Sequence, residues 1–271
     1  MFSDIIGDNI KYATEFSKVH IDGESKFSFL KHDVIEEDYV INKLSTARAL
    51  HLKKGRYTLL TLPSVYEACE DKFDYYVNVL ERALGKYITN DLKSVLVVGL
   101  GNRHMVADSL GAKVVGQIKV TGSITSGVSV YAIAPSVLGL TGIESSDIIA
   151  GVCKIIKPQL VIIIDSLCAN DVTRLGSSFQ ISTNAFVPGS GVENARKKIT
   201  QPNVISIGVP LVVYTKTFIF QAFKKYNVKY NDSDDFDGVV VTPNNVDLIV
   251  DSGAKLIAKA INKRIEKIEK L

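Results

Sequence analysis

Tryptophan is absent from these 271 residues, and methionine and cysteine are scarce, with two and three residues. The cysteines, Cys69, Cys153 and Cys168, are odd in number and fit no metal-binding spacing. A disulfide framework is therefore not expected, and reduced thiols are typical of an intracellular protein. A chain of this length can bury a sizeable core without such cross-links.

Long apolar runs and a secretory signal are missing as well. The first residues, MFSDIIGDNIKYATEF, lack the basic segment followed by an apolar core that marks a signal peptide. The apolar runs are far shorter than a membrane span. The net charge is only +3, and the basic residues form no stripe with interleaved aromatics. We therefore expect a soluble cytoplasmic protein that binds neither a membrane nor nucleic acid.

Short apolar segments instead alternate with helical patterns from residue 57 onward. Continuously apolar runs such as 94–98 and 160–164 are typical of buried parallel strands. Further strands are expected at 57–62, 128–133, 204–208 and 239–241, and helices at 64–87, 105–115, 143–156 and 244–271. This order predicts an α/β fold in which a mostly parallel sheet carries helices on both faces. Residues 1–45 lack a clear pattern, so we expect an N-terminal arm (1–45) before a single α/β domain (46–271).

Two aspartates follow strands of the expected sheet, at the edge where ligands of parallel sheets bind. Asp165 directly follows the run 160–164, and Asp108 lies shortly after the run 94–98. Each could be structural, as a helix N-cap or as a negative charge near the positive end of a helix dipole. Each could instead be a catalytic carboxylate, and the pattern leaves both interpretations open. Such a pair could hydrolyse peptides, because one carboxylate takes a proton from water while the other donates one to the amide.

The segment after the run 94–98 is rich in glycine. Gly99, Gly101 and Asn102 belong to a Gly-x-Gly-x-x-His pattern, in which His104 replaces the third glycine of a dinucleotide-binding motif. The acidic ribose partner expected about twenty residues later is also missing. We therefore expect these glycines to allow a tight turn and close backbone approach, and no nucleotide or other organic cofactor.

Other catalytic schemes have weaker support in the sequence. Gly189, Ser190 and Gly191 lack the spacing of a nucleophile elbow, although their N–H groups could donate to an oxyanion. Cys168 could be a nucleophile, but a buried thiol is the more common role of such a residue. The histidines show no ligand spacing, and His104 is the one candidate for metal binding.

Seven blocks, read in order, resemble the germination protease family. They are VVGLGN (97–102), DSLGAKVV (108–115), AIAPSVLGLTGIE (132–144), IIDSL (163–167), PGSGVENAR (188–196), IGVP (207–210) and VTP (241–243). The resemblance implies an endopeptidase that degrades small acid-soluble spore proteins at germination, in the cytoplasm of the spore. It also implies a zymogen that trims its own N-terminus, and a homotetramer.

The resemblance assigns an unusual aspartic-type mechanism to Asp108 and Asp165. It implies a fold similar to the hydrogenase maturation proteases, which bind metal through acidic residues at the equivalent places. Two alternatives follow: a metal-dependent protease of that type with His104 as third ligand, and a catalytically silent sporulation homologue.

Four more residues are candidates on the same grounds. Glu144 and Arg196 could orient or bind the substrate, although each could equally be a surface charge or part of a structural ion pair. Family substrates are cut after an acidic residue and before a hydrophobic one. The bond between Glu15 and Phe16 is therefore the expected site of self-cleavage.

Overall fold

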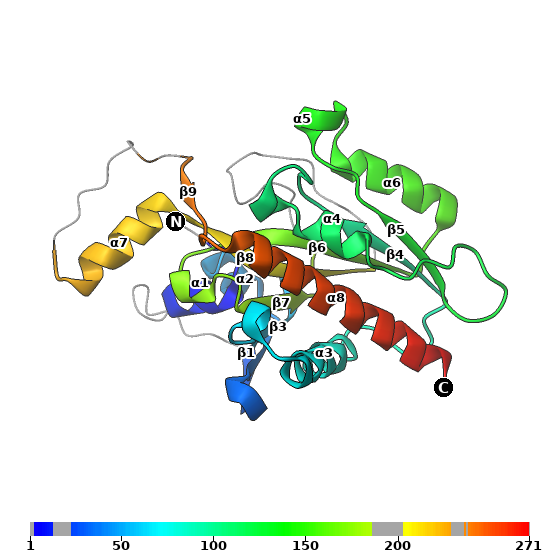
Figure 1. Ribbon diagram of the computed structural model, residues 1–271, viewed down its shortest axis with the longest axis horizontal. Helices are drawn as coiled ribbons and strands as arrows, with labels where there is room; N and C mark the ends of the chain where they lie inside the picture. Colours follow the sequence, from blue (N-terminus) through cyan, green and yellow to red (C-terminus); the bar gives the residue numbers. More distant parts are fainter. Residues whose placement is uncertain (1–2, 13–22, 186–202, 229–235, 237, 271) are drawn as a thin grey trace.

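The computed structural model describes residues 3–12, 23–185, 203–228, 236 and 238–270, and Figure 1 shows how its elements are arranged. A nine-stranded sheet runs through the molecule in the order β1-β2-β3-β7-β8-β6-β4-β5, and β9 also pairs with β8. Buried apolar clusters lie on both faces of this sheet beneath helices. The predicted α/β fold is therefore confirmed.

Four strands form the parallel part of the sheet. They are β4 (Ser94–Gly99), β5 (Ser129–Ile133), β6 (Leu160–Ala169) and β8 (Val204–Tyr214). β4 lies between β5 and β6, and β8 lies on the other side of β6, all in parallel pairing. Most of their apolar residues are buried, because the strands are covered on both faces. Their carboxyl ends therefore share one edge of the sheet.

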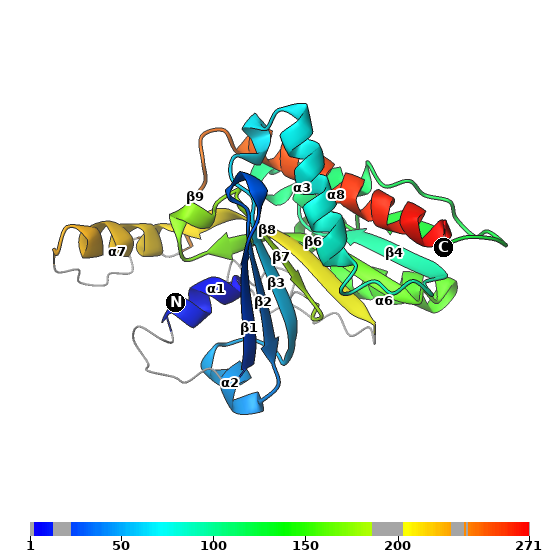
Figure 2. The same ribbon diagram turned by 90° about the horizontal axis from the view of Figure 1, so that it is seen from below.

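The remaining strands pair antiparallel, so the parallel arrangement is confined to those four. They are β1 (Gly23–Phe29), β2 (Ile35–Ile41), β3 (Gly55–Thr61), β7 (Ser178–Ser182) and the short β9 (Val240–Val241). β7 joins the two parts, because it pairs with β3 on one side and with β8 on the other. Figure 2 shows β1, β2 and β3 beside one another at this end of the sheet.

The N-terminal region contributes strands that the sequence pattern did not predict. β2 pairs with both β1 and β3 and so joins the same sheet as the rest of the chain. Its Glu36 and Glu37 are buried, which obscures the alternation of a typical strand. Glu36 pairs with Arg82 and, at 2.5 Å, with Lys86, and Glu37 lies 3.6 Å from Arg174. The division at residue 45 and the propeptide character of the arm stay predictions.

One face of the sheet is covered by three helices. They are α3 (Glu70–Leu84), α4 (Leu110–Val115) and the long α8 (Val246–Glu269). Their apolar residues join alternate strand residues such as Val97, Ile162 and Ile207 in the largest buried cluster. Two short 3₁₀ turns, η3 (Val65–Glu67) and η4 (Val106–Asp108), contact α8 on this side.

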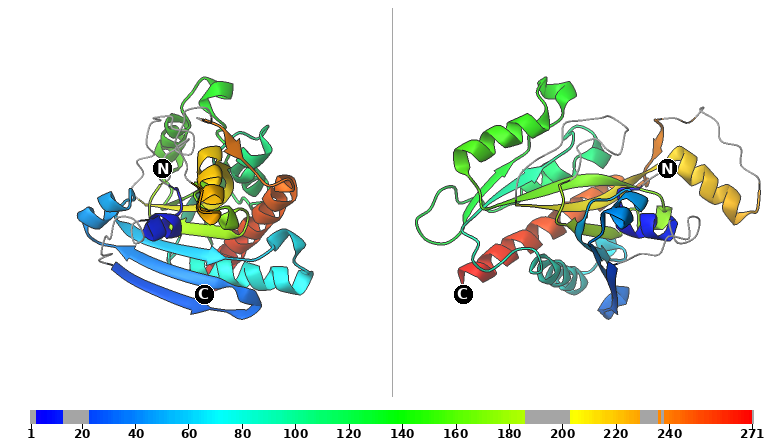
Figure 3. Two further views of the ribbon diagram at one scale, coloured as in Figure 1. Left: turned by 90° about the vertical axis from the view of Figure 1, so that its left-hand side faces the viewer. Right: turned by 180° about the vertical axis from the view of Figure 1, so that it is seen from behind.

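The opposite face carries α6 (Ser145–Ile156), α1 (Ile6–Tyr12) and α2 (Leu44–Ala49). Ile149 of α6 packs with Val161 and Ile163 of β6, and the start of α1 packs with Leu167 farther along the same strand. Val161, Ile163 and Leu167 are separated by even numbers of residues and so share one face of the strand. The right-hand view of Figure 3 shows α6 and α8 on opposite sides of the sheet.

The other helical segments are exposed or short. α5 (Leu138–Thr141) and α7 (Thr215–Lys225) bury none of their residues, and Figures 1 and 2 show α7 extending away from the sheet. The 3₁₀ turns η2 (Lys31–Asp33) and η5 (Val172–Arg174) complete the described elements. Within the described ranges, no helix is both long and apolar enough to span a membrane.

Candidate active site

Asp165 lies inside β6, at the point where the neighbouring strand β4 ends. Gly99, the last residue of β4, pairs with Ile164, whereas β8 continues alongside β6 as far as Ala169. The strand continues past Asp165, so the alternative role of this residue as a helix cap is wrong. Its side chain is buried, and its Oδ1 accepts the N–H of Ser166 at 2.9 Å.

Asp108 is the last residue of η4, which follows the glycine-rich turn. The turn wraps around this aspartate: the Asn102 N–H donates to Asp108 Oδ2 at 2.7 Å. Gly101 has a φ of +96°, and a Cβ there would lie 2.0 Å from the Asp108 carbonyl oxygen. A Cβ on Gly99 would lie 2.1 Å from the carbonyl oxygen of Gly111. The expectation that these glycines permit a tight turn and close approach is therefore confirmed.

The same turn connects the two aspartates through the backbone. The N–H of Leu100 donates to the carbonyl oxygen of Ile164 at 2.8 Å, immediately before Asp165. η4, which ends at Asp108, packs against β6 and β8. Two carboxylates that are 57 residues apart in the sequence thus come to one edge of the sheet.

The remaining described candidates lie near this edge without forming a metal centre. The His104 side chain is exposed, and its backbone N–H donates to Asn102 Oδ1 at 2.9 Å. Glu144 immediately precedes α6 and is partly buried, and its side chain does not cap the helix. Across the described part of the chain, no three His, Cys, Asp or Glu side chains gather closely enough to hold a metal ion.

Six candidates lie outside the residues that the structure describes, so its geometry says nothing about them. They are Glu15 and Phe16 of the expected self-cleavage site, and Gly189, Ser190, Gly191 and Arg196 of the segment before β8.

The sequence interpretation missed the contact between the N-terminal segment, residues 3–12, and β6 just beyond Asp165. The Asp4 N–H donates to the Cys168 carbonyl at 3.1 Å, and the Cys168 N–H donates to Asp4 Oδ2 at 3.0 Å. Gln180 of β7 also holds this segment, because its side chain donates to the Asp4 carbonyl at 2.9 Å and accepts the Ile6 N–H at 2.8 Å. Burial raises the pKa of the Cys168 thiol to about 12, so this side chain is a poor candidate for a nucleophile.

Asp8 of the N-terminal segment is a buried carboxylate with a full set of partners. Its Oδ2 accepts the Asn170 N–H at 2.8 Å and the Ser3 hydroxyl at 2.9 Å. Its Oδ1 accepts Arg174 Nε at 3.2 Å. Burial raises the pKa of Asp8, although these donors act in the opposite direction. The apolar pair Ile5-Ile6 beside two aspartates was the signal that could have indicated this docking.

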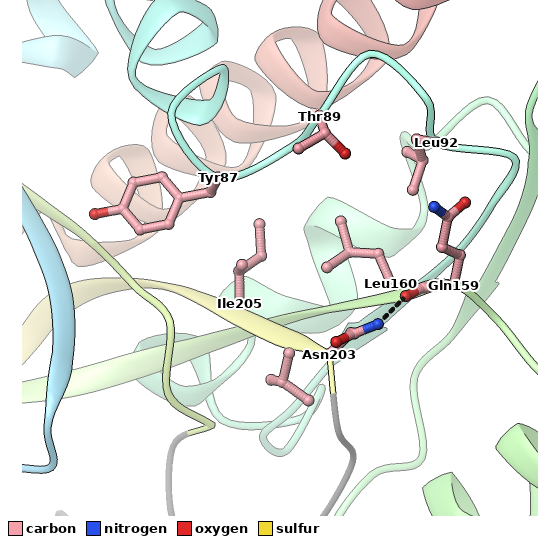
Figure 4. Close-up of a pocket in the computed structure, with 8 residues that line it drawn as sticks. Tyr87, Thr89, Leu92, Gln159, Leu160, Asn203 and Ile205 are labelled. Carbon is pink, nitrogen blue, oxygen red and sulfur yellow. Dashed lines mark hydrogen bonds between the residues drawn. The ribbon is translucent and has the colours of Figure 1, made fainter.

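A pocket lies at the opposite edge of the sheet, at the amino ends of the parallel strands (Figure 4). Leu160 and Val204, the first residues of β6 and β8, contribute to its wall, and Asn203 Nδ2 donates to the Gln159 carbonyl at 3.1 Å. Asp165 is five residues farther along β6, or about 17 Å at the rise of an extended strand. This pocket is therefore separate from the aspartate site.

Comparison with known proteins gives a consistent result. A family model described as germination protease matches residues 29–233. The germination protease of Clostridium acetobutylicum is 34% identical over 255 residues, covering 78% of each chain. That of Priestia megaterium is 40% identical over 184 residues, covering 62% of this chain and 50% of that protein. The structure of the [NiFe] hydrogenase maturation protease HycI from Thermococcus kodakarensis is 16% identical with a TM-score of 0.42, covering 69% of this chain and 99% of that one.

Proposed function

Because this chain belongs to the germination protease family, we propose that it is an endopeptidase that initiates the degradation of small acid-soluble spore proteins at germination. In this proposal Asp108 and Asp165 divide the hydrolysis, one activating the attacking water and the other protonating the amide nitrogen. The observation that carries this proposal is the backbone link between the two sites. The turn that holds Asp108 is hydrogen-bonded to the residue before Asp165. The role of the protein in the spore follows from its family.

Two neighbouring carboxyl groups can divide the chemistry of peptide hydrolysis. One carboxylate takes a proton from water, whose oxygen then bonds to the carbonyl carbon. The second carboxyl group donates its proton to the amide nitrogen as the C–N bond breaks. The products are a carboxylic acid and an amine, and no redox partner is needed. Either aspartate can take either role in this scheme.

A metal-dependent protease on the same fold is the second candidate. It would use Asp108 and Asp165 as ligands, with His104 as the third. In the described chain His104 is exposed and does not form a metal-binding group with the two aspartates. The two-aspartate mechanism therefore remains our preferred proposal. A chelator distinguishes the two mechanisms, because it should stop cleavage only by a metal-dependent enzyme.

We also propose that the N-terminal segment keeps the enzyme inactive until it is removed. Asp4 of this segment is hydrogen-bonded to Cys168 of β6, three residues after Asp165. Self-cleavage between Glu15 and Phe16 would release it. We propose that the active form is a homotetramer, which the native mass in solution would test. Its proposed location is the cytoplasm of the spore.

The decisive experiment compares the wild type with Asp108→Asn and Asp165→Asn, each lacking residues 1–15, on a purified small acid-soluble spore protein. Each substitution should lower the rate of cleavage by about 10² to 10⁴-fold, the range for loss of a general acid or base. Asp251→Asn is the matched control, because Asp251 is an exposed residue of α8 paired with Lys113. Circular dichroism of all four proteins would check that they are folded.

The outcomes separate the candidate functions. Cleavage by the wild type that resists EDTA and is lost in both site variants supports two catalytic aspartates. Cleavage that EDTA stops and zinc restores identifies the metal enzyme. Full activity in either site variant would refute the mechanism, and an inactive wild type identifies a silent homologue.

A further inference from the structure

The start of α6 lies on the same edge and the same face of the sheet as Asp165. β5 and β4 are parallel neighbours, so the loop that leaves β5 after Ile133 emerges beside the turn that follows β4. This loop leads through α5 into α6. Asp165 is two residues from both Ile163 and Leu167, which pack on the face of β6 that α6 covers. Residues two apart in a strand share a face, so Asp165 lies on this face as well. We therefore take the first turn of α6 as a wall of the proposed substrate site.

Two buried serine hydroxyls at this helix start have no hydrogen-bond partner among the residues that the structure describes. Ser136, in the loop after β5, is 8% exposed, and Ser146, in the first turn of α6, is 6% exposed. The Oγ atoms of both lack a partner in the structure. Ser145 Oγ donates to the Ser136 carbonyl at 2.7 Å and so holds the loop against the helix. Buried polar groups are nearly always satisfied, so two orphans in one place indicate a missing ligand.

The helix itself adds the complementary charge. α6 has 12 residues, and the first N–H groups of a helix have no acceptor in the helix itself. The Glu144 carbonyl accepts the Asp147 N–H at 2.9 Å, so the N–H groups of the proposed site are those of Ser145 and Ser146. The partial positive charge at this end favours an anion. Glu144, at the N-cap position, does not bond these groups through its side chain. Asp147 is exposed on the outer side of the first turn and has contacts of its own.

We propose that Ser136, Ser146 and the first N–H groups of α6 bind a carboxylate of the peptide beside the catalytic aspartates. The donors are neutral hydroxyl and amide groups, which suits a singly charged carboxylate with two acceptor oxygens. This carboxylate is either an acidic side chain of the substrate or the α-carboxylate of a cleavage product. The inference rests on the proposed peptidase function, because that function supplies the peptide.

Small capped dipeptides test the site directly. Acetyl-Ala-Glu-amide carries only a side-chain carboxylate, acetyl-Ala-Gln with a free C-terminus carries only an α-carboxylate, and acetyl-Ala-Gln-amide carries neither. Each is titrated into the full-length ¹⁵N-labelled protein, and the amide resonances of Ser145 and Ser146 are followed. We expect them to shift with at least one charged peptide and not with the neutral one. The peptide that acts identifies the source of the carboxylate.

Variants then assign the binding to the two hydroxyls. Ser136→Ala and Ser146→Ala should each weaken binding of the active peptide about tenfold or more, the usual effect of a hydrogen bond to a charged group. Ser178→Ala is the matched control, because Ser178 in β7 is also buried and its hydroxyl also lacks a partner. The Ser178→Ala variant should bind the active peptide with the same affinity as the wild type.

Failure of this inference is distinguishable from failure of the proposed function, because binding is measured without turnover. Equal binding of the neutral peptide, unshifted Ser145 and Ser146 resonances, or unchanged affinity in both serine variants would each overturn the carboxylate site. None of these results would alter the outcome of the Asp108 and Asp165 experiment. Conversely, specific carboxylate binding by a protein that cleaves nothing would support the site and reject the peptidase.

Discussion

Gly101 is the residue on which the position of Asp108 depends most directly. A methyl group at Gly101 would lie 2.0 Å from the Asp108 carbonyl oxygen and 2.8 Å from its Oδ1, and the φ of +96° disfavours any side chain. Gly101→Ala should therefore displace the carboxylate. A displacement of about 1 Å can lower catalytic rates about 100-fold, and we expect kcat/KM for spore-protein cleavage to fall by that order.

Gly122→Ala is the control for this substitution. Gly122 also has a positive φ, of +65°, but no heavy atom lies within 4 Å of the position of its Cβ. The Gly122→Ala variant places a side chain at a positive φ without a collision between its Cβ and other atoms. Its kcat/KM should therefore stay close to the wild-type value. Equal losses in both variants would show that strain, and not the displacement of Asp108, causes the effect.

Cys168 illustrates how burial suppresses the reactivity of a side chain close to the site. Burial, assisted by the Asp4 carboxylate, raises the pKa of Cys168 to about 12, whereas Cys69 is exposed. At pH 8, iodoacetamide should modify Cys69 in the native protein and reach Cys168 only after denaturation, because the thiolate is the reactive form. Mass spectrometry of peptides identifies the modified residue. Rapid native modification of Cys168 would contradict the burial argument.

At the scale of elements, the contact between α3 and α8 contains a buried ion pair. Glu81 and Arg264 are 6% and 7% exposed, and their side chains approach to 3.7 Å. Arg264 also donates to the carbonyl oxygen of Ile88 at 2.5 Å and to Asn90 at 2.7 Å, and Lys267 lies 3.5 Å from Glu81. Arg264 thus ties α8 to the loop that follows α3.

Removing one partner of this pair should cost more than replacing both. Glu81→Met leaves the Arg264 charge buried, and we expect a loss of about 3–5 kcal/mol in the free energy of unfolding. The double variant Glu81→Met with Arg264→Met should recover part of that loss. Urea unfolding of both single variants and the double variant gives the coupling energy. Additive losses would show that the two charges act independently.

Element β2 also shows why a strand can escape detection from sequence. Its buried acids, Glu36 and Glu37, find Arg82, Lys86 and Arg174 only after the chain has folded. Those bases lie in α3, the segment after it, and η5, far along the sequence. A pattern rule that expects apolar residues at buried positions therefore does not recognise this strand.

At the scale of the whole molecule, the N-terminal segment completes one of the buried apolar clusters of the described chain. Ile5 and Ile6 are fully buried and pack with residues that include Leu59 of β3 and Leu167 of β6. Burial of each such side chain contributes about 1.5–3 kcal/mol. Removal of residues 1–12 should therefore lower the free energy of unfolding by about 3–6 kcal/mol, measured by urea denaturation.

Lys11→Ala provides the control within the same segment. The Lys11 side chain is 59% exposed, and its pair with Asp171 spans 3.4 Å at the surface, so the variant should lose less than about 1 kcal/mol. If the truncated protein is as stable as the full-length chain, the segment is a removable cover and not a part of the core.

The sequence by itself determined the α/β fold class, the parallel strands and the tight glycine turn. These features are local: a continuous apolar run predicts a strand covered on both faces, and Gly-x-Gly after it predicts a close backbone approach. The sequence also identified Asp108 and Asp165 as candidates, because each follows such a run. Their catalytic role stays a prediction.

Only the tertiary structure decided how distant segments meet around Asp165. β6 continues past this residue because β8 accompanies it, and the N-terminal segment pairs with its far end. The orphaned hydroxyls of Ser136 and Ser146 likewise appear only when the loop after β5 packs against α6. The physical reason is the same in each case. Burial and hydrogen-bond satisfaction depend on partners far away in the sequence, and no local periodicity encodes them.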